Sequence, residues 1–353
     1  MEKRRDSNIE LLRIFCYLGT VLLHVYGNFM PEARGTIRIF GIMINCLFNT
    51  GVSIFILISG YYGIKSLSYK KLVSFWLFLL FYSLFGEILV QTINDSFDVR
   101  GIIKAFFPIY TRRSWFMSTY FLLMIFSPWI NRIVESLSEV EFLKLCFAFF
   151  TIFSLIPSCI GWTFFNDSGK GIGNLFFIYL VGQYFSKYLS KYKINKTYCI
   201  YVGLTVFGVM MFLTTIKTVW KREVGIEGPF YRDASVLTVI LSVTIFLFFI
   251  KCSISSRVIN FIARRGMCIF LIDGIIIKFI LSSISIPQNG IGILYCIGTV
   301  LLILIIAVAI ESVRYPISCV IDKVVIHIIE SLREKIVALD VFSYLKNKFC
   351  ISE

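Results

Sequence analysis

Two ionisable residues, Arg13 and His24, stand at the ends of an otherwise uncharged stretch, RIFCYLGTVLLH. On an α-helix their separation corresponds to an advance of about 1100°, within about 20° of whole turns, and to a rise of roughly 16 Å. They therefore share one face, near opposite ends of the segment. Histidine is the commonest general base near neutral pH, and arginine holds oxyanions with a two-pronged contact. The spacing suggests a base and an oxygen-binding cation aligned along one helix.

The same face carries further polar residues. Glu10, Arg13, Tyr17, Thr20 and His24 follow a 3-4-3-4 repeat, which makes one continuous stripe on a helix. Ionisable groups in a membrane helix normally face the bundle interior or a wet cavity, so the stripe favours a functional channel. The alternative is that Arg13 snorkels to the inner headgroups and His24 sits at the outer interface.

The composition decides whether such a helix lies in a membrane. Of 353 residues, 58% are hydrophobic and 16% charged, with a mean hydropathy of +0.82. Soluble domains average about 45–50% apolar and about 25% charged residues. The chain is therefore an integral membrane protein, and its net charge of +14 indicates basic cytoplasmic loops and not a nucleic acid partner. The ten cysteines show no metal-ligand spacing. No small-residue cleavage site follows the first apolar stretch, so we expect it to be retained.

A transmembrane helix needs roughly 20 mainly apolar residues. On that basis we predict an all-α bundle with ten transmembrane helices, at approximately 10–28, 38–60, 72–93, 115–133, 143–162, 173–188, 198–216, 234–251, 267–286 and 291–312. Placing both termini in the cytoplasm puts roughly twice as many basic residues inside as outside, which supports an N-in, C-in topology. We assign residues 1–315 to the transmembrane domain and 316–353 to a cytoplasmic tail whose amphipathic helix lies along the inner interface.

Three stretches, in order, resemble the membrane-bound acyltransferase 3 family. NIELLRIFCYLGTVLLH (8–24) is similar to the opening helix of that family, in which a basic residue, ten residues and a histidine follow one another. GVSIFILISGYYGIK (51–65) looks like the end of its second helix, and SWFMSTYFLLMIFSPWIN (114–131) like its Trp-aromatic, Tyr, Ser-Pro-x-x-Asn segment. The resemblance extends to the hydropathy pattern of the whole chain.

The resemblance implies a function and a set of site residues. A glycan O-acyltransferase of this type moves an acyl group, commonly acetyl, from cytoplasmic acyl-CoA to a hydroxyl of an extracytoplasmic or lipid-linked glycan. It implies a multi-pass protein of the bacterial cell membrane, surrounded by lipids, with acyl-CoA as a donor substrate and no tightly bound cofactor or metal. We predict that His24 is the general base and that Arg13 positions the donor. The predicted substrate-binding residues are Glu10, Tyr17, Thr20, Ser59, Tyr61, Lys70, Lys71, Arg113, Trp115 and Tyr120.

Within this set, we expect Ser59 and Tyr61 to line the cytoplasmic entrance and Lys70 and Lys71 to hold the CoA phosphates. On the outer side, Trp115 and Tyr120 would stack on a sugar or act as interface anchors, and Arg113 would meet an acidic glycan or lipid headgroups.

The chain departs from the family pattern at two places. Lys70 and Lys71 in SLSYKKL stand where relatives often carry arginines, and lysine lacks the two-pronged contact. Asp273 in IFLIDG stands where relatives often show a histidine, so the role of that histidine is in doubt here. We considered a pairing of Asp273 with Lys278, although their i,i+5 spacing is poor for contact on one helix.

Two other interpretations remain open. GKGIG (169–173) lacks the GxxxxGK[ST] pattern of a phosphate loop and is more typical of a flexible loop. A transporter, such as a lipid-linked glycan flippase, would also use an intramembrane arginine and histidine. Transporters often show paired halves with broken helices, and the sequence has no such internal repeat.

Overall fold

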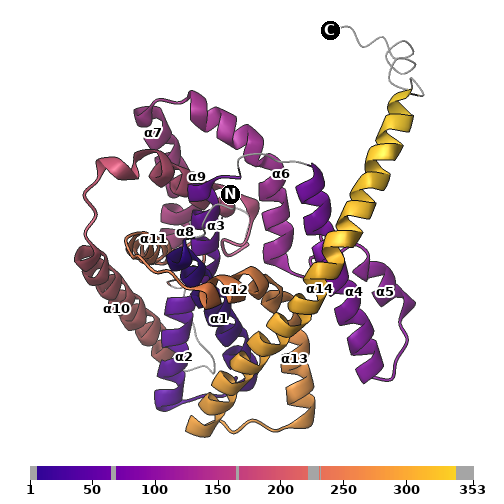
Figure 1. Cartoon of the computed structure of the whole chain (residues 1–353). Coiled ribbons are helices and arrows are strands. Elements are labelled where there is room, and N and C mark those ends of the chain that lie inside the picture. The colour runs from indigo at the N-terminus through magenta and orange to yellow at the C-terminus, as the bar shows by residue number, and fades with distance from the viewer. Residues whose placement is uncertain (1–5, 65–68, 164–166, 222–229, 231, 339–353) are drawn as a thin grey trace.

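The computed structural model describes residues 6–64, 69–163, 167–221, 230 and 232–338 (Figure 1). These residues form helices and no strand. The α-helices are α1 (Ser7–Phe29), α2 (Gly35–Phe48), α3 (Thr50–Tyr62), α4 (Tyr69–Ile93), α5 (Val99–Ala105), α6 (Trp115–Ser136), α7 (Glu139–Phe150), α8 (Ile156–Ile160), α9 (Ile172–Tyr188), α10 (Lys196–Lys221), α11 (Val236–Ile250), α12 (Arg257–Arg265), α13 (Ile269–Ser283) and α14 (Gly290–Ala338). A π-helical turn, Thr151–Leu155, joins α7 to α8.

Each of the ten segments predicted to span the membrane overlaps one or more of these helices. In the described residues, seven helical segments are long and apolar enough to cross a bilayer: Ser7–Phe29, Gly35–Tyr62, Tyr69–Ile93, Glu139–Ile160, Lys196–Trp220, Arg257–Ser283 and Gly290–Leu332. The other three predicted spans correspond to α6, α9 and the short apolar α11. The chain is thus an all-helical, multi-pass membrane protein, and the count of ten spans stays a prediction.

Helix α1 lies at the centre of the bundle. It packs against α2, α3, α11, α12, α13 and α14, and its apolar side chains, such as Leu12 and Val21, are fully buried. Glu10 and Tyr17 of the polar stripe are buried as well, at 6% and 4% exposure. The stripe therefore faces the interior of the bundle, as expected for polar groups in lipid.

Helices α3 and α9 make a very close contact, and two glycines allow it. A Cβ atom on Gly60 would lie 2.3 Å from the carbonyl oxygen of Tyr179, and one on Gly182 would lie 2.5 Å from that of Leu57. Any side chain at either position would force the two backbones apart. Small residues permit this kind of approach between membrane helices, where packing replaces the hydrophobic effect. The Ser-Gly-Tyr end of the second family-like stretch thus has a structural role through Gly60.

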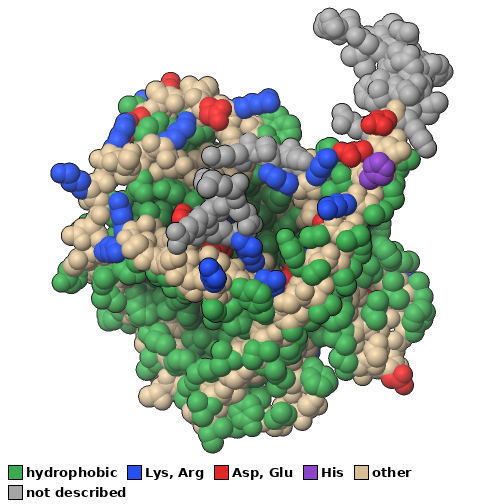
Figure 2. All heavy atoms as spheres, viewed as in Figure 1, with side chains coloured by type: hydrophobic (Ala, Val, Ile, Leu, Met, Phe, Trp, Pro, Cys, Tyr) green, Lys and Arg blue, Asp and Glu red, His purple; other side chains and the backbone are tan. Residues whose placement is uncertain are grey.

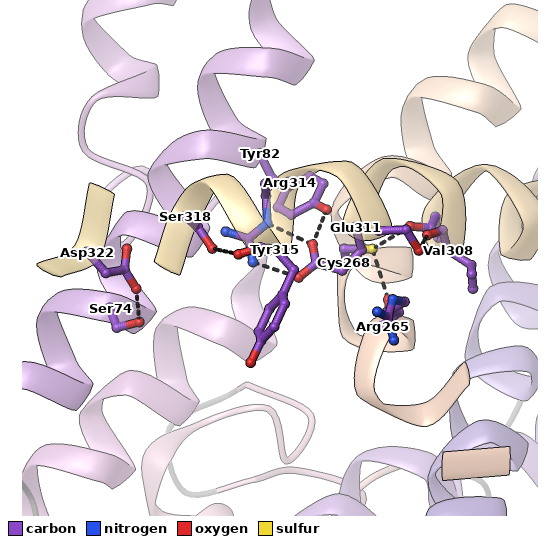
Figure 3. A network of polar contacts seen from close by, with 12 residues as sticks. Ser74, Tyr82, Arg265, Cys268, Val308, Glu311, Arg314, Tyr315, Ser318 and Asp322 are labelled. Atoms are coloured by element: carbon purple, nitrogen blue, oxygen red, sulfur yellow. Dashed lines mark hydrogen bonds and ion pairs between the residues drawn. The ribbon is translucent and has the colours of Figure 1, made fainter. Parts of the chain in front are cut away.

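Helix α14 is bound to α4 by a polar network (Figure 3). Arg314 makes two hydrogen bonds to the Glu311 carboxylate, at 2.7 and 2.6 Å, and the Tyr82 hydroxyl donates to the same carboxylate at 2.6 Å. Further along, the Ser74 hydroxyl donates to Asp322. Buried ionic groups in a membrane are normally paired in this way, because an unpaired charge is costly.

Helix α14 is also longer than the sequence suggested. It continues without interruption from Gly290 to Ala338 through Pro316, and its C-terminal part projects beyond the bundle (Figure 1). The boundary predicted at 315/316 therefore falls inside one helix, in which Pro316 leaves the carbonyl oxygen of residue 312 without its usual backbone donor. That a transmembrane domain ends at residue 315 and that an interfacial tail begins at residue 316 both stay predictions. Residues 339–353 of that tail lie outside the described residues.

The two ends of the bundle differ in charge. The N-terminus of α1 lies beside the end of α3, where the Tyr62 hydroxyl donates to Asp6 at 3.0 Å, and the start of α4 lies beside the last part of α14, where Lys70 pairs with Glu330 at 2.8 Å. We call this the terminal end and the opposite one the His24 end. In Figure 2, lysine and arginine side chains gather toward the terminal end, whereas the lower part of that face is mostly hydrophobic.

Candidate active site

His24 forms an ion-pair-like contact with Asp273. Nδ1 of His24 lies 2.5 Å from Oδ2 of Asp273, and the other carboxylate oxygen, Oδ1, accepts from the backbone N–H of Gly274 at 2.7 Å. The Asp273 side chain is 8% exposed, whereas that of His24 is 49% exposed. The carboxylate thus fixes one ring nitrogen, and the imidazole as a whole remains accessible. A histidine held by a buried carboxylate is the arrangement that orients a general base.

The pairing corrects the sequence interpretation of Asp273, because its partner is His24 of α1 and not Lys278. Lys278 lines the side chamber together with Asp273, but the i,i+5 separation on α13 is poor for contact and no ion pair joins these two described residues. Asp273 instead points across the interface between α13 and α1, two helices that pack against each other.

The pair opens into a cavity of about 500 Å³ at the His24 end, which we call the His24 chamber. Its wall is formed by α1, the junction of α2 and α3, the start of α6, α13 and three loops, those before α6, α9 and α11. The residues with polar or aromatic side chains that line it are Thr20, His24, Asn45, Phe48, Asn49, Phe55, Arg112, Arg113, Ser114, Trp115, Phe116, Lys170, Asp233, Phe270 and Asp273. The volume is sufficient for a small organic group or one sugar ring.

A second cavity, of about 430 Å³, lies between α4, α6 and α13; we call it the side chamber. It shares Arg113, Ser114, Phe270 and Asp273 with the His24 chamber, so the two spaces adjoin at Asp273. The Arg113 guanidinium is held there by Glu87 at 2.6 Å. Two cavities that meet at one candidate catalytic pair provide room for two substrates.

The loop before α11 brings a buried acid to the His24 chamber. Asp233 is only 6% exposed, and burial raises its pKa from 3.8 to about 7, an effect that the nearby Asp167 carboxylate reinforces and the Lys170 ammonium opposes. Desolvation disfavours the charged form of a carboxylate, which explains the direction. The chamber therefore contains two acids, Asp233 and Asp273, of which only the second contacts His24.

Between His24 and Arg13 the interior is filled by aromatic rings. Tyr17 packs against Phe55 and Phe270, with ring centroids 5.0 and 5.4 Å apart, and Phe116 lies 6.0 Å from Phe55. Arg13 lies on the other side of Tyr17, and its Nε is buried with no hydrogen-bond partner in the described part of the chain. Arg13 and His24 thus lie on one helix face, as the spacing predicts, but of the two only His24 lines the His24 chamber.

The predicted entrance residues lie toward the terminal end. Tyr61 lines two cavities, of about 590 and 710 Å³, and the larger one also contains Arg132 and Lys187. The Ser59 hydroxyl lies 3.2 Å from that of Tyr120 and donates to the carbonyl oxygen of Phe55. Tyr120 therefore contacts Ser59 and does not line the His24 chamber, whereas Trp115 does.

Asn131, the last residue of the third family-like stretch, connects three helices at the larger of these cavities. Its Nδ2 donates to the carbonyl oxygen of Ile64 at 3.1 Å, and its Oδ1 accepts from Tyr179 at 3.0 Å and also from Gln183. These bonds explain structurally why an asparagine fits at this position of α6.

The two lysines predicted to hold CoA phosphates lie at the start of α4. Lys70 pairs with Glu330, whose carboxylate also accepts from the Tyr69 hydroxyl at 2.5 Å. Both partners in the Lys70–Glu330 pair are substantially exposed, and exposed ion pairs contribute little to stability. The pair is therefore weak enough for a phosphate to replace it, and the assignment of Lys70 and Lys71 stays a prediction.

Two acids and one cation were not assigned to the site from sequence. Asp273 carried a usable signal, since an acid inside a span needs a basic partner and His24 is the histidine of the first span. Asp233 and Lys170 lie in loops, and nothing in their local sequence shows that the loops meet. Among the described residues, no group of three or more His, Cys, Asp or Glu side chains is arranged to hold a metal ion.

The fold and the site together define the class of protein. It is a helical multi-pass membrane protein in which a carboxylate orients a histidine on the wall of an open chamber. This arrangement is suited to removing a proton from a substrate. Comparison with protein families narrows this class. The model of the acyltransferase 3 family, described as an acyltransferase domain, matches residues 6–310. The chain belongs to this family, and it is an enzyme that transfers acyl groups. Neither the curated proteins nor the solved structures contain a significant match.

Proposed function

We propose that the protein is an O-acyltransferase that moves an acyl group, most simply acetyl, from cytoplasmic acyl-CoA to a hydroxyl of an extracytoplasmic or lipid-linked glycan. The observation that carries the proposal is the His24–Asp273 pair on the wall of an open chamber. An alcohol is a poor nucleophile until a base removes its proton, and a histidine held by a carboxylate is suited to that step.

The reaction balances with the groups present. With Nδ1–H donated to Asp273, the lone pair of Nε2 is available to take the proton of the acceptor hydroxyl. The hydroxyl oxygen forms a bond to the thioester carbonyl carbon, and the tetrahedral intermediate collapses as the C–S bond breaks. The imidazolium then returns its proton to the CoA thiolate. Asp273 stabilises the transient imidazolium, as the carboxylate does in the Ser-His-Asp triad.

The donor has to reach the chamber from the terminal end. Arg13 has a guanidinium nitrogen that is buried without a hydrogen-bond partner in the described part of the chain, which supports a role in holding a donor phosphate or carbonyl. Arg13 lies roughly 16 Å from His24 along the axis of α1, and this distance suits the long pantetheine arm of the donor. The rings of Tyr17, Phe55 and Phe270 occupy that path, so their displacement would accompany donor binding.

The cytoplasmic side is assigned to the terminal end. Lysine and arginine side chains gather there (Figure 2), and an excess of basic residues is typical of cytoplasmic loops. This orientation places the His24 chamber outside, where a glycan is accessible, in the cell membrane of a bacterium. Residues 1–5, which contribute to the basic bias, lie outside the described residues.

The test is transfer of labelled acetyl groups from acetyl-CoA by the purified protein to a panel of added glycans. His24→Ala should lower the rate by about 10²-fold to 10⁴-fold, the usual contribution of a general base, without loss of protein from the membrane. Arg13→Lys should be impaired and Arg13→Ala more so, because an ammonium cannot reproduce a two-pronged contact. Full activity of His24→Ala would refute the mechanism. Glycan translocation in the absence of any acyl-CoA would favour the flippase instead.

A further inference from the structure

Parts of two loops that are far apart in sequence, residues 167–171 and 232–235, are held together beside the His24 chamber. The buried Asn174 donates through Nδ2 to the carbonyl oxygen of Gly169 at 2.9 Å and to that of Asp233 at 3.4 Å. Gly169 has a φ of +87°, and a Cβ atom there would lie 2.4 Å from the backbone nitrogen of Ala234. The GKGIG segment is therefore not a loose loop: glycine is required at residue 169 both by its dihedral angle and by the contact with the second loop.

The first loop is also fixed to the chain that precedes it. The Thr163 hydroxyl accepts from the backbone N–H of Asp167 at 2.8 Å, and Oδ1 of Asp167 accepts from that of Gly169 at 2.9 Å. The second loop is attached to α8, since the backbone N–H of Val236 donates to the Ser158 hydroxyl at 2.9 Å. The backbone at Gly169 and Asp233 is thus fixed by hydrogen bonds before any ligand arrives, which lowers the entropic cost of binding.

Each loop places one charged residue on the wall of the chamber. The ammonium of Lys170 lies 5.4 Å from the centroid of the Trp115 ring, and Trp115 lines the same chamber. Asp233 is more than nine-tenths buried and also lines the chamber. In the described part of the chain, no hydrogen bond or ion pair involves its side-chain oxygens. A buried carboxyl without a partner, at the wall of an open cavity, points to a ligand that supplies the missing hydrogen bonds.

We propose that Asp233, Lys170 and Trp115 form the acceptor subsite of the His24 chamber, and that the group bound there is a sugar ring with adjacent hydroxyls. The carboxylate accepts from one hydroxyl, the ammonium donates to the oxygen of its neighbour, and the indole packs against the C–H face of the ring. This inference rests on the proposed function, because it supplies the acceptor for that reaction. It makes Asp233 a positioning residue that holds the sugar while His24 acts on a different hydroxyl.

The carboxyl of Asp233 favours a hydroxyl over a phosphate or an acidic group as its own partner, in a chamber whose wall also carries Arg112, Arg113 and Lys170. A carboxylate would repel an anion, whereas it binds hydroxyl donors well. The raised pKa of Asp233 agrees with this, since a carboxyl near neutrality can also donate a hydrogen bond when protonated.

The experiment measures binding by calorimetry in detergent, with no acyl-CoA present, so that it is independent of catalysis. The probes are methyl β-D-galactopyranoside, methyl α-D-glucopyranoside and their singly deoxygenated forms. Asp233→Asn should weaken binding of the intact glycoside by roughly 10-fold to 100-fold, as expected for one hydrogen bond to a charged group. Deleting the hydroxyl that Asp233 contacts should weaken binding to the unaltered protein and have no further effect in Asp233→Asn, because the two changes remove the same bond.

The matched control is Asp95→Asn, the same change at an exposed residue of another loop, which should bind every glycoside as the unaltered protein does. Lys170→Gln, at an exposed position, tests the same subsite if Asp233→Asn does not fold. The proposal is wrong if no glycoside of the panel binds, if Asp233→Asn binds with unchanged affinity, or if the hydroxyl deletion has the same effect in both proteins. Glycoside binding without any acetyl transfer would leave the subsite standing and reject the proposed reaction.

Discussion

Replacing Asp273 with asparagine tests the site most directly, because both oxygens of the carboxylate are in use. Oδ2 contacts Nδ1 of His24 at 2.5 Å, and Oδ1 accepts from the backbone N–H of Gly274 at 2.7 Å. Asparagine has one oxygen and one NH₂ group for these two contacts. If its oxygen stays with Gly274, its NH₂ group faces Nδ1 of His24. The ring must then carry its proton on Nε2, and a protonated Nε2 cannot act as a base.

The expected loss of kcat in Asp273→Asn lies between two limits. Loss of one hydrogen bond to a charged group corresponds to about 1.5–3 kcal/mol, or roughly 10-fold to 150-fold at about 1.4 kcal/mol per factor of ten. Complete loss of the general base corresponds to about 10²-fold to 10⁴-fold. Asp273→Asn should therefore reduce kcat by at least about 100-fold. Asp273→Ala should be less harmful, since it leaves His24 free to adopt either tautomer.

The assay is transfer of labelled acetyl groups, normalised to the amount of protein in the membrane. Asp95→Asn serves as the control, since Asp95 is exposed and has a φ of 46°, which asparagine tolerates well. Two results would refute the reasoning. Full activity of Asp273→Asn would mean that the carboxylate has no part in catalysis, and a slower Asp273→Ala than Asp273→Asn would exclude the tautomer argument.

Four further predictions concern donor binding, stability and topology. Changing Lys70 and Lys71 together to alanine should raise the KM for acyl-CoA with expression and kcat intact, and an effect on kcat alone would contradict a role in phosphate binding. Glu311→Ala should destabilise the protein by about 3–5 kcal/mol, because the Arg314 side chain, 11% exposed, would remain buried without its partner. An unchanged midpoint of thermal unfolding in detergent would show that the network in Figure 3 is dispensable. A reporter fused to the C-terminus should be cytoplasmic and one inserted between α4 and α5 external, whereas an external C-terminus would exclude the ten-span topology. The pKa of Asp233 is about 7 in the folded protein, above its ordinary value of 3.8, so between pH 3.8 and pH 7 the folded state binds more protons and its stability falls as pH rises. The free energy of unfolding of Asp233→Asn should therefore exceed that of the unaltered protein by up to about 4 kcal/mol near pH 8 and should equal it near pH 4. An equal difference at both pH values would contradict this prediction.

The sequence by itself determined the class of protein and the face of the first helix. A run of roughly 20 apolar residues has few alternatives to a membrane helix, since every backbone polar group must be satisfied internally in lipid. The 3.6-residue period then places Glu10, Tyr17 and His24 on one side, and the cost of exposing ionisable groups to lipid turns that side inward. Both statements depend only on local spacing. The three family-like stretches gave the acyltransferase family for the same reason, since each is a short, continuous pattern.

The partners of these residues were decided by the tertiary structure alone. Asp273 is 249 residues away from His24 in sequence, and only the packing of α13 on α1 brings the two together. Lys170 and Asp233 reach one chamber because Asn174 holds their loops, a contact that depends on Gly169 and that no local pattern reports. The sequence also could not show that aromatic rings separate Arg13 from His24. A helix face fixes which residues align along one element, whereas the volume beside that face is filled by side chains from other helices.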